Sequence, residues 1–341
     1  MTSSGEAVRV AIAGASSLLG KELNLWLEES NFPASEIRLV DEEFVAGTLT
    51  EAGGEPAVIE TVTEDSFERV RFAFFTGSPE FTKHHADEAR RAGAVVIDLS
   101  GGLGADATAR PWIPALDAVL GSPAVSFPAA EPQSLFVVPA APSDAAISIS
   151  AALASAGLER LAMTVLQPVS EYGREAIEEL ESQVVKLLSF QPVPQTVFDA
   201  QVGFNMLSRY GPESGFKLSE ASERIVKESR RYLDGRAPVP AVMLVQAPVF
   251  YSHTFTAYAE FKAAPDLEKL VEVLQDAGLK VARAQDEPPS NVNVVGEVRP
   301  VLRQPERDPG IETGVWLWGA ADNLRVPAAN AVAIAQKLLA S

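Results

Sequence analysis

The first thirty residues constrain the fold of this 341-residue chain more than any other segment. An apolar run over residues 8–13 leads into a turn that begins at Gly14, and apolar residues then recur at helical spacing through Leu23 and Leu27. A strand, a glycine turn and a helix in this order form the first unit of a parallel sheet that binds dinucleotides. The pattern therefore predicts a doubly wound α/β nucleotide domain.

The predicted turn contains the candidate cofactor-binding residues Gly14, Ser16, Ser17, Leu18, Leu19 and Gly20. In dinucleotide-binding turns the first glycine permits the bend, the middle one lets backbone approach the pyrophosphate, and the last allows close packing of helix on strand. Ser17 occupies the middle position, where its amide can still donate to a phosphate at the helix N-terminus. A purely structural strand-to-helix turn remains the alternative.

The predicted second strand ends in an acidic triplet, Asp41, Glu42 and Glu43. An acidic side chain at this point suits the 2′-hydroxyl of a ribose and repels a 2′-phosphate. If a dinucleotide binds, Asp41 therefore favours NAD over NADP. The triplet could also be a solvated surface turn.

Composition predicts a soluble protein of two domains. The chain is long enough for two cores, and its hydrophobic residues, 47% of the total, form no run approaching the ~20 residues of a membrane-spanning helix. The first seven residues, MTSSGEA, lack the basic start and apolar core of a signal peptide, so the cytoplasm is the default location.

Charge and cysteine content exclude several classes of function. A net charge of -18 argues against nonspecific binding to nucleic acid or to an anionic membrane, because both need clustered basic residues. The chain has no cysteine, which excludes disulfides and thiol catalysis. The adjacent His84 and His85 suggest a metal, but neighbouring positions on a helix do not face one another, so we expect surface residues and no metal site.

Three further segments carry a resemblance to a known family. They are GVWLWGAADNLRVPAANAVAIAQKLLA near the C-terminus, TVLQPVSEYGREAIEELESQ after residue 163, and VMLVQAPVFYSHTFTAYAEF after residue 241. The first is similar to a C-terminal strand, an Asp-Asn-Leu-Arg turn and a last helix. The second is similar to a Thr-Tyr-Gln-Ala-Val-Ser-Gly-x-Gly segment, and the third to an arginine, Pro-Val and Gly-His-Ser. Together with the glycine turn, they resemble the aspartate-semialdehyde dehydrogenase family over nearly the whole chain.

The resemblance implies an α/β protein of two domains. A Rossmann-like nucleotide domain would contain residues 1–136 and 326–341, and an α+β dimerisation and substrate domain would contain residues 137–325. The apolar runs VMLVQAPVF and GVWLWGAA fit a sheet with one face on helices and the other on a partner, so we expect a homodimer. The family cofactor is NAD or NADP, and the resemblance adds Gly77 and Asn323 to its candidate ligands.

The family's nucleophile is missing from this chain. Where the family has Asn-Pro-Asn-Cys-Ser-Thr, the segment LFVVPAAPSDAAISIS places Asp144 in the cysteine position. The family thiolate forms a thioacyl intermediate, from which hydride is exchanged with the nicotinamide. A carboxylate adds poorly to an aldehyde and leaves more readily than the adduct surrenders hydride.

Other family site positions are partly retained. Gln167 matches the active-site glutamine, His253 the general base and Glu228 the family glutamate, while Arg224 stands where a lysine is usual. Gln246 replaces the arginine that clamps the substrate carboxylate, and a neutral amide cannot form that bidentate pair. The arginine of the phosphate site gives way to the stretch LGADA. Arg224 and Glu228, four residues apart on one helix, could simply pair with each other.

Three functions remain open at this point. The first is a catalytically silent family member with a binding, regulatory or scaffold role. The second is an enzyme with different chemistry in the same cleft, using His253 as acid or base with Asp144 as its partner. The third is an active semialdehyde dehydrogenase of amino-acid biosynthesis, which the loss of the cysteine disfavours. The ligand, the partner proteins and the binding of any cofactor are left undetermined.

Overall fold

The computed structural model describes residues 7–52, 54–120 and 134–340. Two compact units divide the chain. The first unit contains residues 1–114, 123–140 and 327–341, and the second contains residues 115–122 and 141–326. None of the helices described is long and apolar enough to cross a membrane.

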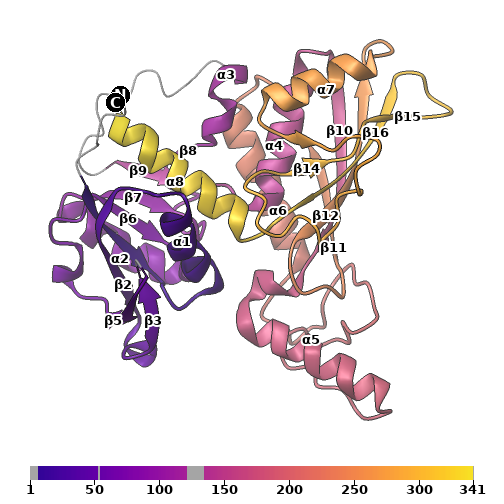
Figure 1. The fold of residues 1–341 in the computed structure, drawn as a ribbon. Helices are drawn as coiled ribbons and strands as arrows, with labels where there is room; N and C mark the ends of the chain where they lie inside the picture. Colours follow the sequence, from indigo (N-terminus) through magenta and orange to yellow (C-terminus); the bar gives the residue numbers. More distant parts are fainter. Residues whose placement is uncertain (1–6, 53, 121–133, 341) are drawn as a thin grey trace. The chain divides into compact units, whose positions relative to one another are not determined.

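A seven-stranded parallel sheet forms the centre of the first unit (Figure 1), in the order β5-β2-β1-β6-β7-β9-β8. Its strands are β1 (Val8–Ala13), β2 (Ala34–Asp41), β5 (Glu60–Thr61), β6 (Phe72–Phe75), β7 (Val95–Asp98), β8 (Arg110–Pro111) and β9 (Leu135–Val137). The helices are α1 (Leu18–Glu29), α2 (Pro79–Arg91) and α8 (Arg325–Ala340), and β3 (Leu49–Ala52) and β4 (Glu55–Val58) form a hairpin. This confirms the predicted nucleotide fold, and β1 has the predicted bounds.

Alternation along β1 divides the core of this unit into two layers. Val10 and Ile12 lie in a cluster with apolar residues of α1 and α8, such as Leu23 and Ile334. Ala11 lies with apolar residues of α2 in a second cluster. Successive side chains of a strand point to opposite faces, so helices cover both faces of the sheet, as a parallel sheet requires.

A mixed sheet forms the second unit, in the order β11-β10-β12-β16-β14-β13, with β15 paired to β16. Its strands are β10 (Leu158–Gln167), β11 (Ala241–Gln246), β12 (His253–Phe261), β13 (Lys280–Val281), β14 (Val301–Leu302), β15 (Glu306–Arg307) and β16 (Gly314–Ala321). The helices are α3 (Asp117–Leu120), α4 (Ala141–Ala154), α5 (Gly173–Leu188), α6 (Leu218–Leu233) and α7 (Leu267–Asp276).

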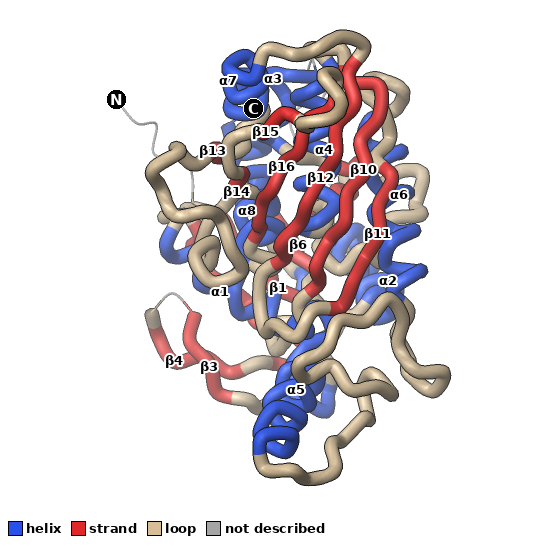
Figure 2. The backbone as a smooth tube through the Cα atoms, turned by 90° about the vertical axis from the view of Figure 1, so that its right-hand side faces the viewer, coloured by secondary structure: helices blue, strands red, loops and turns tan. Residues whose placement is uncertain are grey.

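One face of this mixed sheet is covered by helices and the other is open. Helix α4 packs on β10 and β16, with α6 and α7 beside it, and α6 also contacts β11. The opposite face, turned toward the viewer in Figure 2, carries side chains as exposed as Met243 and Trp316. A sheet with apolar side chains on an uncovered face needs a partner or exposes that surface to water.

Gly14 illustrates how closely the first unit is packed at the predicted turn. Its φ is +90°, and a Cβ placed there would lie 2.2 Å from the backbone nitrogen of Gly77. Such a contact cannot form, so the glycine is required both by its backbone conformation and by the approach of the loop after β6.

We expect Gly14→Ala to lower the free energy of unfolding of the first unit by more than Gly93→Ala does. Gly93 has nearly the same φ, +89°, but a Cβ added there would have no atom within 4 Å, so it controls for backbone strain alone. The difference between the two variants should be about 1–3 kcal/mol, the usual cost of overpacking. Urea unfolding measures both, and equal losses would contradict the packing argument.

Candidate functional site

Ser17 is tied into the nucleotide turn by its side chain. Its hydroxyl accepts a hydrogen bond from the Gly20 amide at 2.9 Å, which caps α1, and donates to the Thr76 carbonyl oxygen at 2.9 Å. The φ of Ser17 is −63°, a value open to any residue. A glycine is therefore not required at the middle position of the turn. Ser17 adopts an ordinary φ there, and its hydroxyl is hydrogen-bonded within the protein.

Asp41 is nearly buried, at 7% exposure, and faces the same turn. One carboxylate oxygen accepts from the Ser16 amide at 2.8 Å, and the other from the Glu42 amide at 2.9 Å. A carboxylate oxygen has two lone pairs, so each can still accept from a ribose hydroxyl. A 2′-phosphate placed there would meet a fixed negative charge.

The rest of the turn is built for close packing. A Cβ on Gly20 would lie 2.6 Å from the Gly14 carbonyl oxygen, and one on Gly77 would lie 2.9 Å from the Phe81 ring. Leu18 and Leu19 begin α1 and are half-buried. The structure thus brings these predicted cofactor residues together at the carboxyl end of β1, where parallel sheets bind nucleotides.

The loop after β7, where the family arginine is absent, closes on Asp98. This buried carboxylate accepts from the amides of Ser100, Gly101 and Leu103 at 2.8, 3.1 and 2.8 Å, and from the Ser100 hydroxyl at 2.7 Å. Four donors are enough to hold the loop in one conformation around the charge.

Asp144 lies in the first turn of α4 and is fully buried. One of its carboxylate oxygens is 3.0 Å from a guanidinium nitrogen of Arg299. The other oxygen accepts from the Ser148 hydroxyl at 3.0 Å, and Arg299 also donates to that hydroxyl at 3.3 Å. The position at a helix N-terminus adds a favourable field for the negative charge.

This arrangement makes Asp144 a structural anion. Arg299 also donates to the Gly278 carbonyl oxygen, just after α7, at 3.2 Å, so the pair connects α4 with the end of α7. A nucleophile must reach a reacting carbon, whereas Asp144 is 0% exposed and ion-paired to Arg299.

Gln246, in the position of the carboxylate-clamping arginine, is also fully bonded. Its side-chain oxygen accepts from the Tyr210 hydroxyl at 2.6 Å, and its nitrogen donates to the carbonyl oxygens of Gln167 and Ala247 at 2.9 and 2.8 Å. The Gln167 amide donates to the Tyr172 hydroxyl at 2.9 Å. The two glutamines therefore meet in one buried network, as donors and acceptors for two tyrosines.

His253, the first residue of β12, is completely buried. Its Nε2 lies 3.8 Å from a carboxylate oxygen of Glu171 in the turn that ends β10. Burial lowers the pKa of His253 below its usual value, and the nearby carboxylates of Glu171 and Asp322 oppose this only in part. The ring is therefore neutral near pH 7.

Asn323 holds the backbone around this histidine. Its side-chain oxygen accepts from the Ser252 amide at 2.9 Å, and its nitrogen donates to the Ser170 hydroxyl at 3.0 Å. Sequence reasoning placed Asn323 among the cofactor ligands, and that role stays a prediction. Within the second unit, the side-chain amide of Asn323 therefore links Ser252, next to His253, with Ser170, next to Glu171.

Arg224 and Glu228 lie one turn apart on α6 and bond to each other, with 2.7 Å between the guanidinium Nε and a carboxylate oxygen. This is the pairing that their spacing allowed. The second carboxylate oxygen of Glu228 is buried without a hydrogen-bond partner among the described residues.

His84 and His85 are on α2, as expected, but their rings do contact each other edge to face, with centroids 4.6 Å apart. The expectation that they would not meet was wrong, because the side chains lean toward each other off the helix surface. His85 bonds Glu88 at 2.8 Å, and no cluster of three metal-ligating side chains occurs among residues that the structure describes.

Two family models match this chain. The semialdehyde dehydrogenase dimerisation domain matches residues 150–326, and the semialdehyde dehydrogenase NAD binding domain matches residues 9–131. The chain belongs to the semialdehyde dehydrogenase family.

Individual relatives match almost end to end. A USG-1 protein homolog of Azotobacter vinelandii is 29% identical over 98% of each chain, and aspartate-semialdehyde dehydrogenase 2 of Vibrio cholerae is 28% identical over 97% of each. The solved structure of a probable aspartate-semialdehyde dehydrogenase from Pseudomonas aeruginosa superposes with a TM-score of 0.86. It is 28% identical and covers 98% of this chain and 99% of its own.

Sequence reasoning missed four residues of the candidate site in this semialdehyde dehydrogenase family member. Arg299 and Tyr210 gave no signal, because each pairs with a residue far away in the chain. Glu171 and Ser252 did give a sequence signal, because both stand where the corresponding family segments have glycine. A side chain at a glycine position next to a candidate base marks a change in that site.

We expect Asp144→Ala to lower the free energy of unfolding by about 3 kcal/mol, because the partly buried Arg299 would lose the carboxylate that compensates its charge. Arg299→Met in the same chain should recover part of this loss, giving a coupling of about 1–3 kcal/mol in a double-mutant cycle. Ser148→Ala is the control, because it keeps both charges and should cost about 1 kcal/mol. Urea unfolding measures the wild type, the two single variants of the cycle, their double variant and the control, and an Asp144→Ala loss as small as that of the control would contradict the structural role.

Proposed function

We propose that this chain is a homodimeric, dinucleotide-binding semialdehyde dehydrogenase homologue that does not form the family's thioacyl intermediate and has a binding or regulatory role. The observation that carries the proposal is the position of Asp144, which replaces the nucleophile and is bonded through both oxygens to Arg299 and Ser148. The family reaction needs a thiolate that attacks the aldehyde carbon and later leaves. No residue type in this chain supplies it.

The loss of substrate-binding charge supports the same proposal. The dehydrogenases among the relatives are named for an aspartyl aldehyde, whose carboxylate needs a cationic partner. Gln246 stands at the arginine position, and its side-chain amide is hydrogen-bonded to Tyr210, Gln167 and Ala247. Restoring the carboxylate clamp would require this buried network to break, which leaves polar groups unsatisfied.

The nucleotide half of the site supports a retained cofactor. The turn keeps Gly14 and Gly20, and Ser17 is accommodated through the α1 cap. Asp41 next to the Ser16 amide favours the ribose diol of NAD over the 2′-phosphate of NADP. We place the protein in the cytoplasm, where NAD is available.

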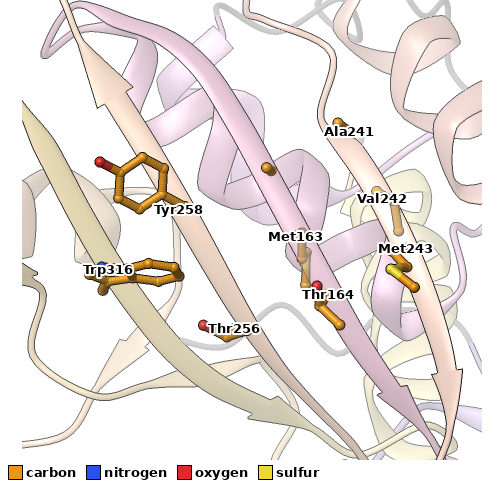
Figure 3. A pocket seen from close by; sticks show the side chains of 9 residues that line it. Met163, Thr164, Ala241, Val242, Met243, Thr256, Tyr258 and Trp316 are labelled. Carbon is orange, nitrogen blue, oxygen red and sulfur yellow. The ribbon is translucent and has the colours of Figure 1, made fainter. Parts of the chain in front are cut away.

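A homodimer is supported by the bare face of the mixed sheet. A hollow of about 320 Å³ lies on this face. Met243, Tyr258 and Trp316 are among the side chains that line it (Figure 3). Methionine and aromatic side chains are enriched in protein interfaces. The matching dimerisation domain covers these strands.

Asp144→Cys tests the proposal, and we expect no oxidation of aspartate semialdehyde above the wild-type background with NAD or NADP and phosphate. A thiol alone does not restore the arginine clamp, and it leaves Arg299 without its anion. The variant contains the chain's only cysteine, so maleimide labelling of the native protein reads whether that thiol is accessible.

Ser143→Cys is the control, since it places the single thiol one position earlier on the same buried turn. We expect both variants to be inactive. Turnover in Asp144→Cys but not in Ser143→Cys would show that the remaining site is competent, and would overturn the proposal.

A further inference from the structure

A hollow of about 240 Å³ lies in the first unit, between α2 and the loop that follows β7. One side of α2 forms its first wall through Lys83, Asp87 and Arg90, whose spacing places them on the same face of the helix. The loop forms the second wall and contributes Asp106. The residues that line this hollow belong neither to the nucleotide turn nor to the second unit, so it is a separate candidate site.

The wall formed by the loop is held firmly in place. At Gly102 the loop touches the first turn of α2, because a Cβ added there would lie 2.6 Å from the Pro79 carbonyl oxygen. Amides at the start of the loop donate to the buried Asp98 carboxylate. Farther along, one carboxylate oxygen of Asp106 accepts from both the amide and the hydroxyl of Thr108 at 2.7 Å. The hollow is therefore preformed, as ligand sites usually are.

The floor of the hollow is apolar. Ala86, Leu103 and Leu135 line it and are 3%, 8% and 4% exposed. Such a surface favours the burial of a hydrocarbon chain. The volume corresponds to about eight water molecules at ~30 Å³ each, so it fits a ligand of about eight non-hydrogen atoms.

Charge is distributed unevenly along the hollow. Lys83 and Arg90 are seven residues apart on α2, which is about 10 Å along the helix axis. The Lys83 ammonium has no hydrogen-bond or ionic partner among the residues that the structure describes, whereas Arg90 bonds Asp87 at 3.2 Å. Hydrogen bonds from Thr108 lower the pKa of Asp106, and the nearby charge of Arg90 lowers it further, so Asp106 lies at the Arg90 end and is ionised near pH 7. Among the lining residues, the Lys83 end is therefore positive and the other end has a net negative charge.

We propose that this hollow binds a short ω-amino acid, whose carboxylate pairs with Lys83 and whose ammonium pairs with Asp106. The methylene chain between the two charges lies on the apolar floor. A simple carboxylic acid would pair with Lys83 but place no partner at Asp106, and the two charges of an α-amino acid are too close together to span the hollow. The inference goes beyond the proposed function, since it needs neither a dinucleotide nor the residues of the family's active site.

Saturation-transfer NMR with 5-aminopentanoate tests the proposal. This probe matches the volume of the hollow and the separation of its charges, and a titration at constant ionic strength gives the dissociation constant. Pentanoate and pentylammonium each lack one of the two charges, and glycine keeps both charges without the chain. Comparison of the four compounds therefore separates recognition of the carboxylate, of the ammonium and of the spacing between them.

We expect 5-aminopentanoate to bind saturably, and each of the other three compounds to bind more weakly by about threefold or more, as loss of an exposed ion pair predicts. Lys83→Met and Asp106→Asn should each weaken binding of 5-aminopentanoate by a similar factor. The asparagine keeps an oxygen for the bonds from Thr108, so the loop stays in place. Lys269→Met and Asp276→Asn remove the same charges at exposed positions on α7 and should leave binding unchanged.

Several results would overturn the site. They are the absence of saturable binding of 5-aminopentanoate, equal binding of pentanoate, pentylammonium or glycine, and unchanged binding in Lys83→Met or Asp106→Asn. None of these readouts uses a dinucleotide or turnover, so the proposed function is tested separately.

Discussion

The ion pair between Asp144 and Arg299 is the interaction on which the chemistry of this protein depends. Asp144 is fully buried at the N-terminus of α4 while Arg299 is 16% exposed, and we infer that the pair occupies the position from which the family attacks its substrate. A buried pair adds little to stability compared with apolar packing, yet removing one partner is expensive. Once Arg299 is present, position 144 is therefore constrained to carry a negative charge.

The same change, from chemistry to structure, is found at Gln246. The residue that would hold a substrate carboxylate now joins β10, β11 and the Tyr210 loop through three side-chain hydrogen bonds. Random loss of a site would leave polar atoms unbonded, whereas these positions are satisfied within the protein. Among the described residues, the buried polar atoms without a hydrogen-bond partner include the Ser252 hydroxyl and both ring nitrogens of His253, and also the Ser143 hydroxyl and one carboxylate oxygen of Glu228.

Local sequence patterns predicted the fold and the family well, because strand, turn and helix signals act over short distances. The bounds of β1, the Gly14 turn and the Arg224–Glu228 pair follow from residue spacing alone. The roles of Asp144 and Gln246 do not, because their partners are 155 and 36 residues away and no periodicity encodes such contacts. The positive φ of Ser252 follows from no spacing pattern either, although the glycine at this position of the corresponding family segment was a signal for it. The contact between His84 and His85 was missed because the spacing rule describes backbone positions and ignores side-chain rotation.

We infer that this protein still binds a dinucleotide although it does not form the thioacyl intermediate of its family. Titration calorimetry of the wild-type protein with NAD and NADP is the decisive test, because it isolates the turn at Gly14 and the carboxylate of Asp41 from any reaction. We predict micromolar binding of NAD and binding of NADP weaker by about tenfold or more, from the charge that Asp41 places at the 2′ position. Absence of NAD binding, or tighter binding of NADP, would contradict this inference.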